Sequence, residues 1–342
     1  MTTGVWDPFP LTLEDGAALE RLRDLAPRAA VCTMPEPWAL FEDDAPEPMH
    51  VVPVGSVERD HLAGLASAVP PGAQIIIGVG GGSSIDTAKY VAEATGLPLL
   101  QIPTIISVDA AFTAPYGYRE GSRVRYAGNL RPIEVVCDPT VIRRSPPELN
   151  RAGVGDLLSC HTGMFDWKVA TDAGLGDIPW NEEAATLGRR VLAEMSEMAP
   201  QIAEVTPDAV RWLAAIHRDV GAGCVAYEPR FEEGSEHFLA YCIEWLTNGH
   251  WVHGELISFC VLVMSTAQGN DPELPAAIVR DSRVDARPSH LGIPDELFHK
   301  AFAELPAYCE REDLWPSAIS LTDVTPELGA RALAFAKDVT GA

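Results

Sequence analysis

Two histidines and one aspartate have the side chains and the setting to hold a metal ion. His237 and His253 lie in successive segments whose apolar residues recur every three or four positions, which predicts two neighbouring helices, and Asp156 opens a third such segment. One carboxylate and two imidazoles suit Zn²⁺ or Fe²⁺ and leave a coordination position for substrate. Helices joined by a short loop lie antiparallel, so we expect the facing ends of these two to bring the imidazoles together.

Spacing alone leaves other assignments of the histidines open. His250 is as good a candidate ligand as the other two, and an isolated histidine is usually a core or surface residue. Four further histidines have no partner that the sequence reveals: His161, His217, His290 and His299. The residue types therefore indicate a metal site, while the choice of its ligands needs further support.

A glycine cluster, formed by Gly78 and residues 80–82, could bind a phosphate group. It follows a β-branched run and precedes a helical pattern that starts near Ser83. Glycines let the backbone approach a phosphate closely, and a helix start offers unpaired N–H groups and the positive end of the helix dipole. Ser83 with Asp86 also matches a capping box. We expect a pyrophosphate site here, with a purely structural turn as the alternative because Ser83 replaces the last glycine of G-x-G-x-x-G.

The sequence predicts an α/β domain and a helical domain, which must position these candidate residues. Short apolar runs alternate with helical patterns in the first part of the chain, which predicts an α/β, Rossmann-like domain with a doubly wound parallel sheet. The expected strands are 29–34, 50–55, the run that begins at 75, 97–105 and 134–139. Helical periods dominate after about residue 147, which predicts an all-α second domain. The predicted domains are therefore residues 1–147 for the dinucleotide and residues 148–342 for metal and substrate, with the active site in the cleft between them.

The composition excludes several classes of function. A formal net charge of −24 leaves no basic surface for nucleic acid or for an anionic membrane. The longest wholly apolar stretch, residues 257–264 broken by one serine, is too short for a membrane span. Seven cysteines without a CxxC pair, and an N-terminus without the features of a signal peptide, predict a reduced cytoplasmic protein.

Several motifs in a fixed order resemble the iron-containing alcohol dehydrogenase superfamily. They are GVGGGSSIDTAK, IPTIISVDAAFTAP, AGVGDLLS followed by DWKVA, EEGSEH and HGE, and they cover roughly residues 50–260. The spacings agree as well, since Asp109 and Asp156 are 47 positions apart and the two histidines are 16 apart. The strongest resemblance is to sn-glycerol-1-phosphate dehydrogenases and then to glycerol dehydrogenase, while dehydroquinate synthase-like cyclases share the fold more distantly.

The resemblance implies a role for individual residues. Asp156, His237 and His253 match the ligands of one divalent metal, with Zn²⁺ expected and Fe²⁺ or Ni²⁺ as alternatives. Asp109 matches an acidic residue that contacts substrate, and Asp156 is expected to contact it too. The positions that match the NAD or NADP site are Gly82, Ser83, Ser84, Ile85, Asp86, Thr104, Ser107 and Thr113. The Asp-Trp-Lys signature at residues 166–168 is expected to support packing or the substrate side.

One position departs from the pattern and bears on the substrate. Tyr241 stands where relatives that use glycerol-1-phosphate carry a second histidine, one helical turn after the first ligand. Tyrosine donates a hydrogen bond but is neutral at pH 7, so an altered substrate pocket is expected. Residues 116–129 are expected to form a solvated loop, with the alternative that its arginines at 119, 123 and 125 contact an anionic substrate.

The reaction that the resemblance implies is reversible hydride transfer between a C–OH group and nicotinamide, assisted by the metal. The expected substrate is a small polyol or polyol phosphate, and the enzyme is expected to be a homo-oligomer. A sugar-phosphate cyclase, which is a lyase that uses NAD and metal transiently, is the alternative enzyme class. A non-catalytic cofactor-binding protein is a third possibility, and the intact ligand set argues against it.

Overall fold

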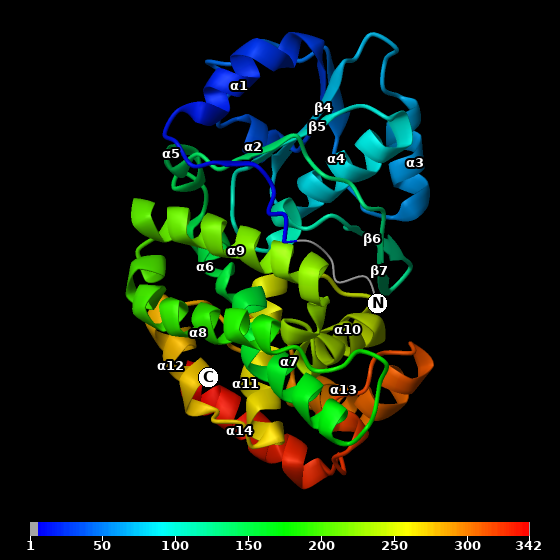
Figure 1. The fold of residues 1–342 in the computed structure, drawn as a ribbon, viewed down its shortest axis with the longest axis vertical. Coiled ribbons are helices and arrows are strands. Elements are labelled where there is room, and N and C mark those ends of the chain that lie inside the picture. Colours follow the sequence, from blue (N-terminus) through cyan, green and yellow to red (C-terminus); the bar gives the residue numbers. More distant parts are fainter. Residues whose placement is uncertain (1–5, 342) are drawn as a thin grey trace. The chain divides into compact units, whose positions relative to one another are not determined.

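The computed structural model describes residues 6–341, which form two compact units. We call residues 7–150 with 205–222 the sheet unit, and Trp6 with residues 151–204 and 223–341 the helical unit. Figure 1 shows the chain as a ribbon coloured along the sequence. Every described strand precedes residue 137, and helices make up the regular structure after it. The predicted fold class, an α/β region with a parallel sheet followed by a helical part, is confirmed.

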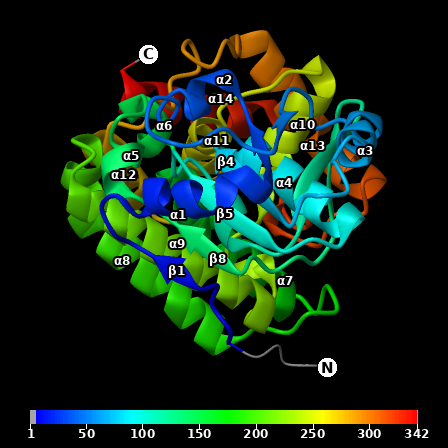
Figure 2. The ribbon, with the colours of Figure 1, turned by 90° about the horizontal axis from the view of Figure 1, so that it is seen from above.

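A six-stranded parallel sheet forms the centre of the sheet unit. Its order is β1 (Leu11–Thr12), β8 (Glu134–Val136), β5 (Leu99–Pro103), β4 (Ile75–Gly80), β2 (Ala29–Thr33) and β3 (His50–Pro53). Adjacent strands are parallel throughout, and the first four follow one another across Figure 2. The helices of this unit are α1 (Ala17–Leu25), α2 (Pro35–Trp38), α3 (Arg59–Ser67), α4 (Gly82–Thr95), α5 (Pro139–Ile142) and most of α6 (Pro147–Arg151). Helix α9 (Pro207–Tyr227) belongs partly to this unit.

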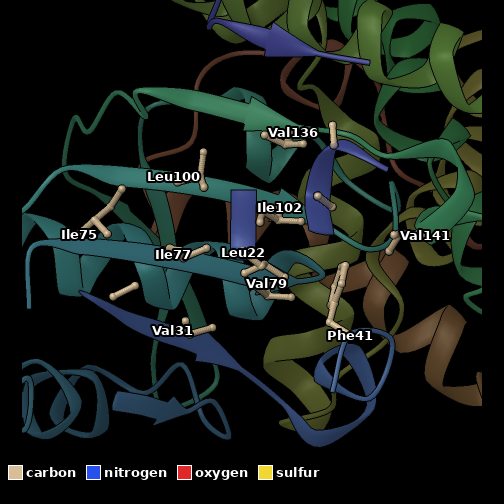
Figure 3. Packing of buried hydrophobic residues seen from close by; sticks show 13 residues of the cluster. Leu22, Val31, Phe41, Ile75, Ile77, Val79, Leu100, Ile102, Val136 and Val141 are labelled. Atoms are coloured by element: carbon tan, nitrogen blue, oxygen red, sulfur yellow. The ribbon is translucent and has the colours of Figure 1, made fainter. Parts of the chain in front are cut away.

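The central strand β4 is buried on both faces, which explains its unbroken apolar sequence. Ile75, Ile77 and Val79 join a cluster with Leu22 of α1 on one face (Figure 3). Ile76, between them, joins a second cluster that includes residues of α4. Alternate side chains of one strand therefore hold helices to opposite faces of the sheet, and this arrangement positions the start of α4.

A two-stranded antiparallel hairpin occupies the segment that was expected to be a loop. It consists of β6 (Tyr116–Glu120) and β7 (Arg123–Ala127). Gly121 in the turn has a φ of +62°, the left-handed conformation that tight hairpin turns favour. The alternation of Tyr116 and Tyr118 with polar residues was the available signal for this hairpin.

Seven long helices make up the helical unit together with the end of α9. They are α7 (Val154–Asp172), α8 (Glu182–Ala203), α10 (Ser235–Thr247), α11 (His253–Gln268), α12 (Glu273–Ser282), α13 (Asp295–Arg311) and α14 (Pro326–Thr340). Helix α11 is buried from Gly254 to Ser265, so it is the central helix of this unit. None of the helices described for residues 6–341 combines the length and the apolar character needed to span a bilayer.

Helices α7 and α11 touch through their backbones at two glycines. A Cβ atom added at Gly155 would lie 2.4 Å from both Cα and the carbonyl oxygen of Gly254, so no larger residue fits without moving a helix. These glycines immediately precede Asp156 and follow His253 in the sequence. The close approach of the two helices therefore sets the separation of two candidate metal ligands.

Replacing Gly155 with Ala is expected to destabilise the protein by about 1–3 kcal/mol, because the new methyl group must push the two helices apart. Gly64 in α3 is the matched control, since a Cβ added there meets open space. Its replacement by Ala is expected to be neutral or to stabilise by about 0.5–1 kcal/mol. Thermal unfolding of the two variants measures the difference, and equal midpoints would contradict the close-contact explanation.

Candidate active site

The glycine cluster forms the turn between β4 and α4, where close packing requires glycine. Gly80 has a φ of +144°, and a Cβ atom added at Gly81 would lie 2.7 Å from Cδ1 of Ile105. A Cβ atom added at Gly82 would lie 3.1 Å from Cγ2 of Val108. The turn therefore lies against the segment that follows β5. This is the carboxyl end of two neighbouring parallel strands, where open α/β sheets bind ligands.

The first turn of α4 fits an anionic group such as a pyrophosphate. Gly81 is the N-cap, and no side chain caps the helix, so its first N–H groups keep their capacity to bind an anion. Ser84 Oγ is fully buried and has no hydrogen-bond partner within the described residues. The capping box predicted for Ser83 and Asp86 is wrong, because both residues lie inside the helix. The glycine cradle and the buried hydroxyl nevertheless favour a ligand at this helix start.

Asp86 has its own partners next to this turn. Its carboxylate lies 3.5 Å from Nζ of Lys89 and accepts a hydrogen bond from the N–H of Gly117 in β6. Burial raises the pKa of Asp86 to about 6, although the charge of Lys89 opposes the rise. Lys89 is itself fully buried and donates a hydrogen bond of 2.7 Å to the carbonyl of Pro115. The pair therefore ties α4 to the hairpin. No role was predicted for Lys89, although it lies three positions after Asp86 in the same motif.

Four predicted cofactor or substrate residues lie together on the segment after β5: Thr104, Ser107, Asp109 and Thr113. Thr104 is buried, and its N–H donates to the carbonyl of Gly80 at 3.0 Å. Asp109 begins a short 3-10 helix, Asp109–Phe112, and remains partly exposed. Its charge acts on the buried ammonium of Lys89. The structure thus brings Thr104 to the glycine turn and Asp109 near Lys89 of α4, while the contacts of all four residues with a ligand stay predictions.

The three candidate metal ligands converge in the helical unit. Their ligand atoms all lie within 4.8 Å of one another. Oδ1 of Asp156 lies 3.3 Å from Nε2 of His253 and 4.0 Å from Nε2 of His237. Two ligand atoms on one tetrahedral Zn²⁺ lie about 3.4 Å apart, so one of these distances already fits an ion and the other fits after a small closure. One oxygen and two nitrogen donors with room for a further ligand suit a catalytic divalent metal.

All three ligands lie at helix N-termini. Asp156 is in the first turn of α7, His237 is in the first turn of α10, and His253 is the first residue of α11. In an antiparallel hairpin the starts of α10 and α11 would be about 15 Å or more apart. Their imidazole rings are 5.4 Å apart, so the expected antiparallel pairing was wrong although the expected convergence is observed. His250, the alternative candidate, is exposed and is not part of this group.

A buried glutamate orients one of the imidazoles. Glu236 is fully buried, and its Oε1 lies 2.8 Å from Nδ1 of His237 and also accepts the N–H of Gly234 at 2.6 Å. With Nδ1 donating to this carboxylate, Nε2 keeps its lone pair for a metal. Burial alone lowers the pKa of His237, but the hydrogen bond and the charges of Glu236, Glu233 and Asp156 outweigh it and raise the pKa to about 9.

Asp166 holds the turn that precedes α10. Its two oxygens accept the N–H groups of Ser235 at 2.6 Å and of Ala318 at 2.7 Å. Burial and the nearby charge of Glu236 raise the pKa of Asp166 to about 6. Trp167 is buried and donates to the carbonyl of Ile178, so this part of the Asp-Trp-Lys signature serves packing in the structure.

Tyr241 lies one turn after His237 on α10, with the two ring centres 5.9 Å apart. Its hydroxyl donates to Oε1 of Glu233 at 2.9 Å. Both side chains are partly exposed, as is His253, whereas Asp156 and His237 are buried. Glu233 and Glu236 were both overlooked as site residues, because the sequence EEGSEH does not reveal which carboxylate turns towards the histidine.

Comparison with known proteins finds similarity to dehydrogenases in both sequence and fold. Residues 41–146 match the family model described as iron-containing alcohol dehydrogenase. Glycerol-1-phosphate dehydrogenase (NAD(P)+) of Methanothrix thermoacetophila is 29% identical over 233 residues, which are 68% of this chain and 65% of that protein. The corresponding protein of Hyperthermus butylicus is 32% identical over 231 residues, which are 66% of this chain and 65% of that protein. The matches thus span slightly less than two thirds of these relatives.

The fold has close counterparts among solved structures. A probable glycerol dehydrogenase from Sinorhizobium meliloti 1021 superimposes with a TM-score of 0.74 at 20% identity, covering 98% of each chain. The predicted resemblance to the iron-containing alcohol dehydrogenase superfamily is therefore confirmed. The curated relatives named above are glycerol-1-phosphate dehydrogenases, so the predicted resemblance in sequence to these enzymes is confirmed as well.

Replacing Glu236 with Gln is expected to weaken binding of Zn²⁺ to the metal-free protein by about 10- to 100-fold, because the anionic acceptor that orients His237 is lost. Calorimetric titration at pH 9, where competition from the His237 proton is small, measures the change. Glu310→Gln, on an exposed part of α13, is the control and should bind as the unmodified protein does. Unchanged affinity in Glu236→Gln would contradict the orienting role.

Metal binding is expected to strengthen as the pH rises. The pKa of His237 in the metal-free protein, about 9, means that the imidazole is protonated at pH 7 and that a divalent ion must displace this proton. Each pH unit below 9 should therefore weaken Zn²⁺ binding by about tenfold, and the dependence should flatten as the pH passes the pKa. Titrations at pH 6.5, 7.5 and 8.5 test this dependence, and a constant affinity would contradict it.

Proposed function

We propose that this protein is a metal-dependent, NAD(P)-linked dehydrogenase that interconverts an alcohol group of a polyol or polyol phosphate with the corresponding ketone or aldehyde. The convergence of Asp156, His237 and His253 carries the proposal. The two histidines are 81 and 97 positions away from the aspartate in the sequence, yet their ligand atoms lie within 4.8 Å of one another. The dehydrogenase relatives and the glycine turn at α4 support the same conclusion.

The cofactor is assigned to the sheet unit. Residues 82–86 would hold its pyrophosphate at the start of α4 through backbone N–H groups, and the buried hydroxyl of Ser84 would gain a partner. Thr104, Ser107 and Thr113 would line the adjoining part of the cofactor. Turnover assays with each cofactor, described below, distinguish NAD from NADP.

The metal is assigned to the helical unit, with Zn²⁺ proposed first. When bound, the divalent ion supplies a Lewis acid for the substrate oxygen, and the nicotinamide supplies or accepts a hydride. Asp156, His237 and His253 would hold the ion, and Glu236 would keep Nε2 of His237 directed towards it. We assign Asp109 a contact with a substrate hydroxyl and assistance in moving its proton.

The proposal extends to the two domains of the protein and to its oligomeric state. We propose that residues 1–147 bind the dinucleotide, that residues 148–342 carry the metal and substrate site, and that the enzyme is a homo-oligomer. A reducing, cytoplasmic location agrees with seven free cysteines, five of which are buried. Burial raises the pKa of the Cys160 and Cys260 thiols well above the ordinary value, which makes both thiols unreactive.

A substrate panel tests the proposed function directly. Polyols, polyol phosphates and aldehydes are assayed with NAD or NADP and with added Zn²⁺ or Fe²⁺, and the absorbance of reduced nicotinamide is followed. A dehydrogenase produces a net change in that absorbance. Consumption of a sugar phosphate without any net change would instead identify a cyclase.

Replacing His253 with Ala is expected to abolish turnover and to lower the metal content, while the cofactor still binds. His250→Ala is the matched control, because this exposed histidine lies three positions away and outside the ligand group. Metal analysis, fluorescence titration with reduced nicotinamide cofactor and the turnover assay separate these effects. A metal-loaded, active His253→Ala protein would overturn the assignment.

A further inference from the structure

The accessible side of the metal centre carries a carboxylate. Asp156, His237 and Glu236 are buried, whereas His253, Tyr241 and Glu233 are partly exposed, so these three residues form the accessible side of the centre. Glu233 lies close enough to act on His237 through its charge, and it is joined to Tyr241 by a hydrogen bond of 2.9 Å. A substrate whose reacting oxygen meets the metal therefore places its neighbouring group beside this pair.

The position of Glu233 is fixed by its backbone. Its N–H donates to the carbonyl of Pro229 at 2.9 Å. A Cβ atom added at Gly163 of α7 would lie 3.1 Å from the carbonyl carbon of Glu232 and 3.2 Å from the nitrogen of Glu233. The backbone thus packs tightly on α7 at this point, and the hydrogen bond from Tyr241 orients the carboxylate that it carries.

The charge around the centre remains negative even with a metal present. The charged groups that raise the pKa of His237 are all carboxylates, namely Glu236, Glu233 and Asp156. A divalent ion neutralises two of these three negative charges, so one remains. A phosphate next to the reacting carbon would meet this excess and could not donate a hydrogen bond to Glu233, whereas a neutral hydroxyl could.

We propose that the Glu233–Tyr241 pair is a specificity determinant that favours an uncharged polyol over a polyol phosphate at the metal centre. The tyrosine hydroxyl orients the carboxylate of Glu233. This carboxylate then lies beside the substrate carbon that adjoins the reacting carbon. This inference rests on the proposed function and narrows its substrate class to neutral compounds with adjacent hydroxyl groups.

The test compares glycerol with glycerol-1-phosphate in the metal-loaded protein. The unmodified protein should have the higher kcat/KM with glycerol. Glu233→Gln removes the charge but keeps an acceptor for Tyr241, and it should shift the ratio of the two kcat/KM values towards the phosphate by about tenfold. A preference of the unmodified protein for the phosphate, or a shift smaller than about threefold, would overturn the proposal.

Tyr241→Phe separates charge from structural damage. This variant loses the hydroxyl that orients Glu233 but keeps the negative charge, so it should shift the ratio towards the phosphate by less than Glu233→Gln does. Metal content is measured for both variants to show that the centre is intact. An equal shift in Tyr241→Phe and Glu233→Gln would mean that charge is not the origin of the selectivity, and would contradict the proposal.

Calorimetric titration of the metal-loaded proteins with both compounds gives a readout that needs no turnover. Glycerol-1-phosphate should bind Glu233→Gln about tenfold more tightly than the unmodified protein, with glycerol little affected. Absence of nicotinamide turnover with either compound, combined with this binding difference, would refute the proposed function while supporting the specificity pair. Turnover of nicotinamide without this binding difference would support the proposed function and refute the specificity pair.

Discussion

The backbone contact between α7 and α11 is the constraint on which the candidate metal centre depends. Only glycine at position 155 lets the two helices approach so closely, and this approach places Asp156 and His253 within 3.3 Å of each other. His237 then joins from α10. Helix α7 and the two consecutive helices α10 and α11 therefore contribute one ligand each, and the geometry of the set comes from helix packing rather than from flexible loops.

Three helix N-termini meet at one point, and the surrounding carboxylates offset the positive potential that these N-termini create. Each N-terminus carries a partial positive charge, which by itself would disfavour a bound cation. Asp156, Glu236 and Glu233 reverse this field and make the point attractive to a divalent ion. In the proposed enzyme, the same negative charge that favours the metal would disfavour an anionic substrate next to it, so metal affinity and substrate choice would share one physical origin.

The sequence was sufficient to predict much of the fold. Unbroken apolar runs and the glycine turn predicted the parallel strands around β4 and the start of α4, because local pattern and burial agree there. The hairpin at residues 116–127 was missed, since its strands are partly exposed and carry mixed side chains. The ligand group was predicted as a set of residues, but the directions of α10 and α11 depend on packing that no local pattern encodes. The roles of Glu236 and Lys89 were not predicted for the same reason, because their hydrogen-bond partners become neighbours only in the folded chain.

Anomalous diffraction from a crystal of the protein loaded with Zn²⁺ tests the central claim most directly. Data collected on the two sides of the zinc absorption edge locate the ion independently of any model of the chain. We expect a peak about 2.0–2.2 Å from an oxygen of Asp156 and from one ring nitrogen each of His237 and His253. Absence of a peak at this point, or an ion held by other residues such as His250, would contradict it.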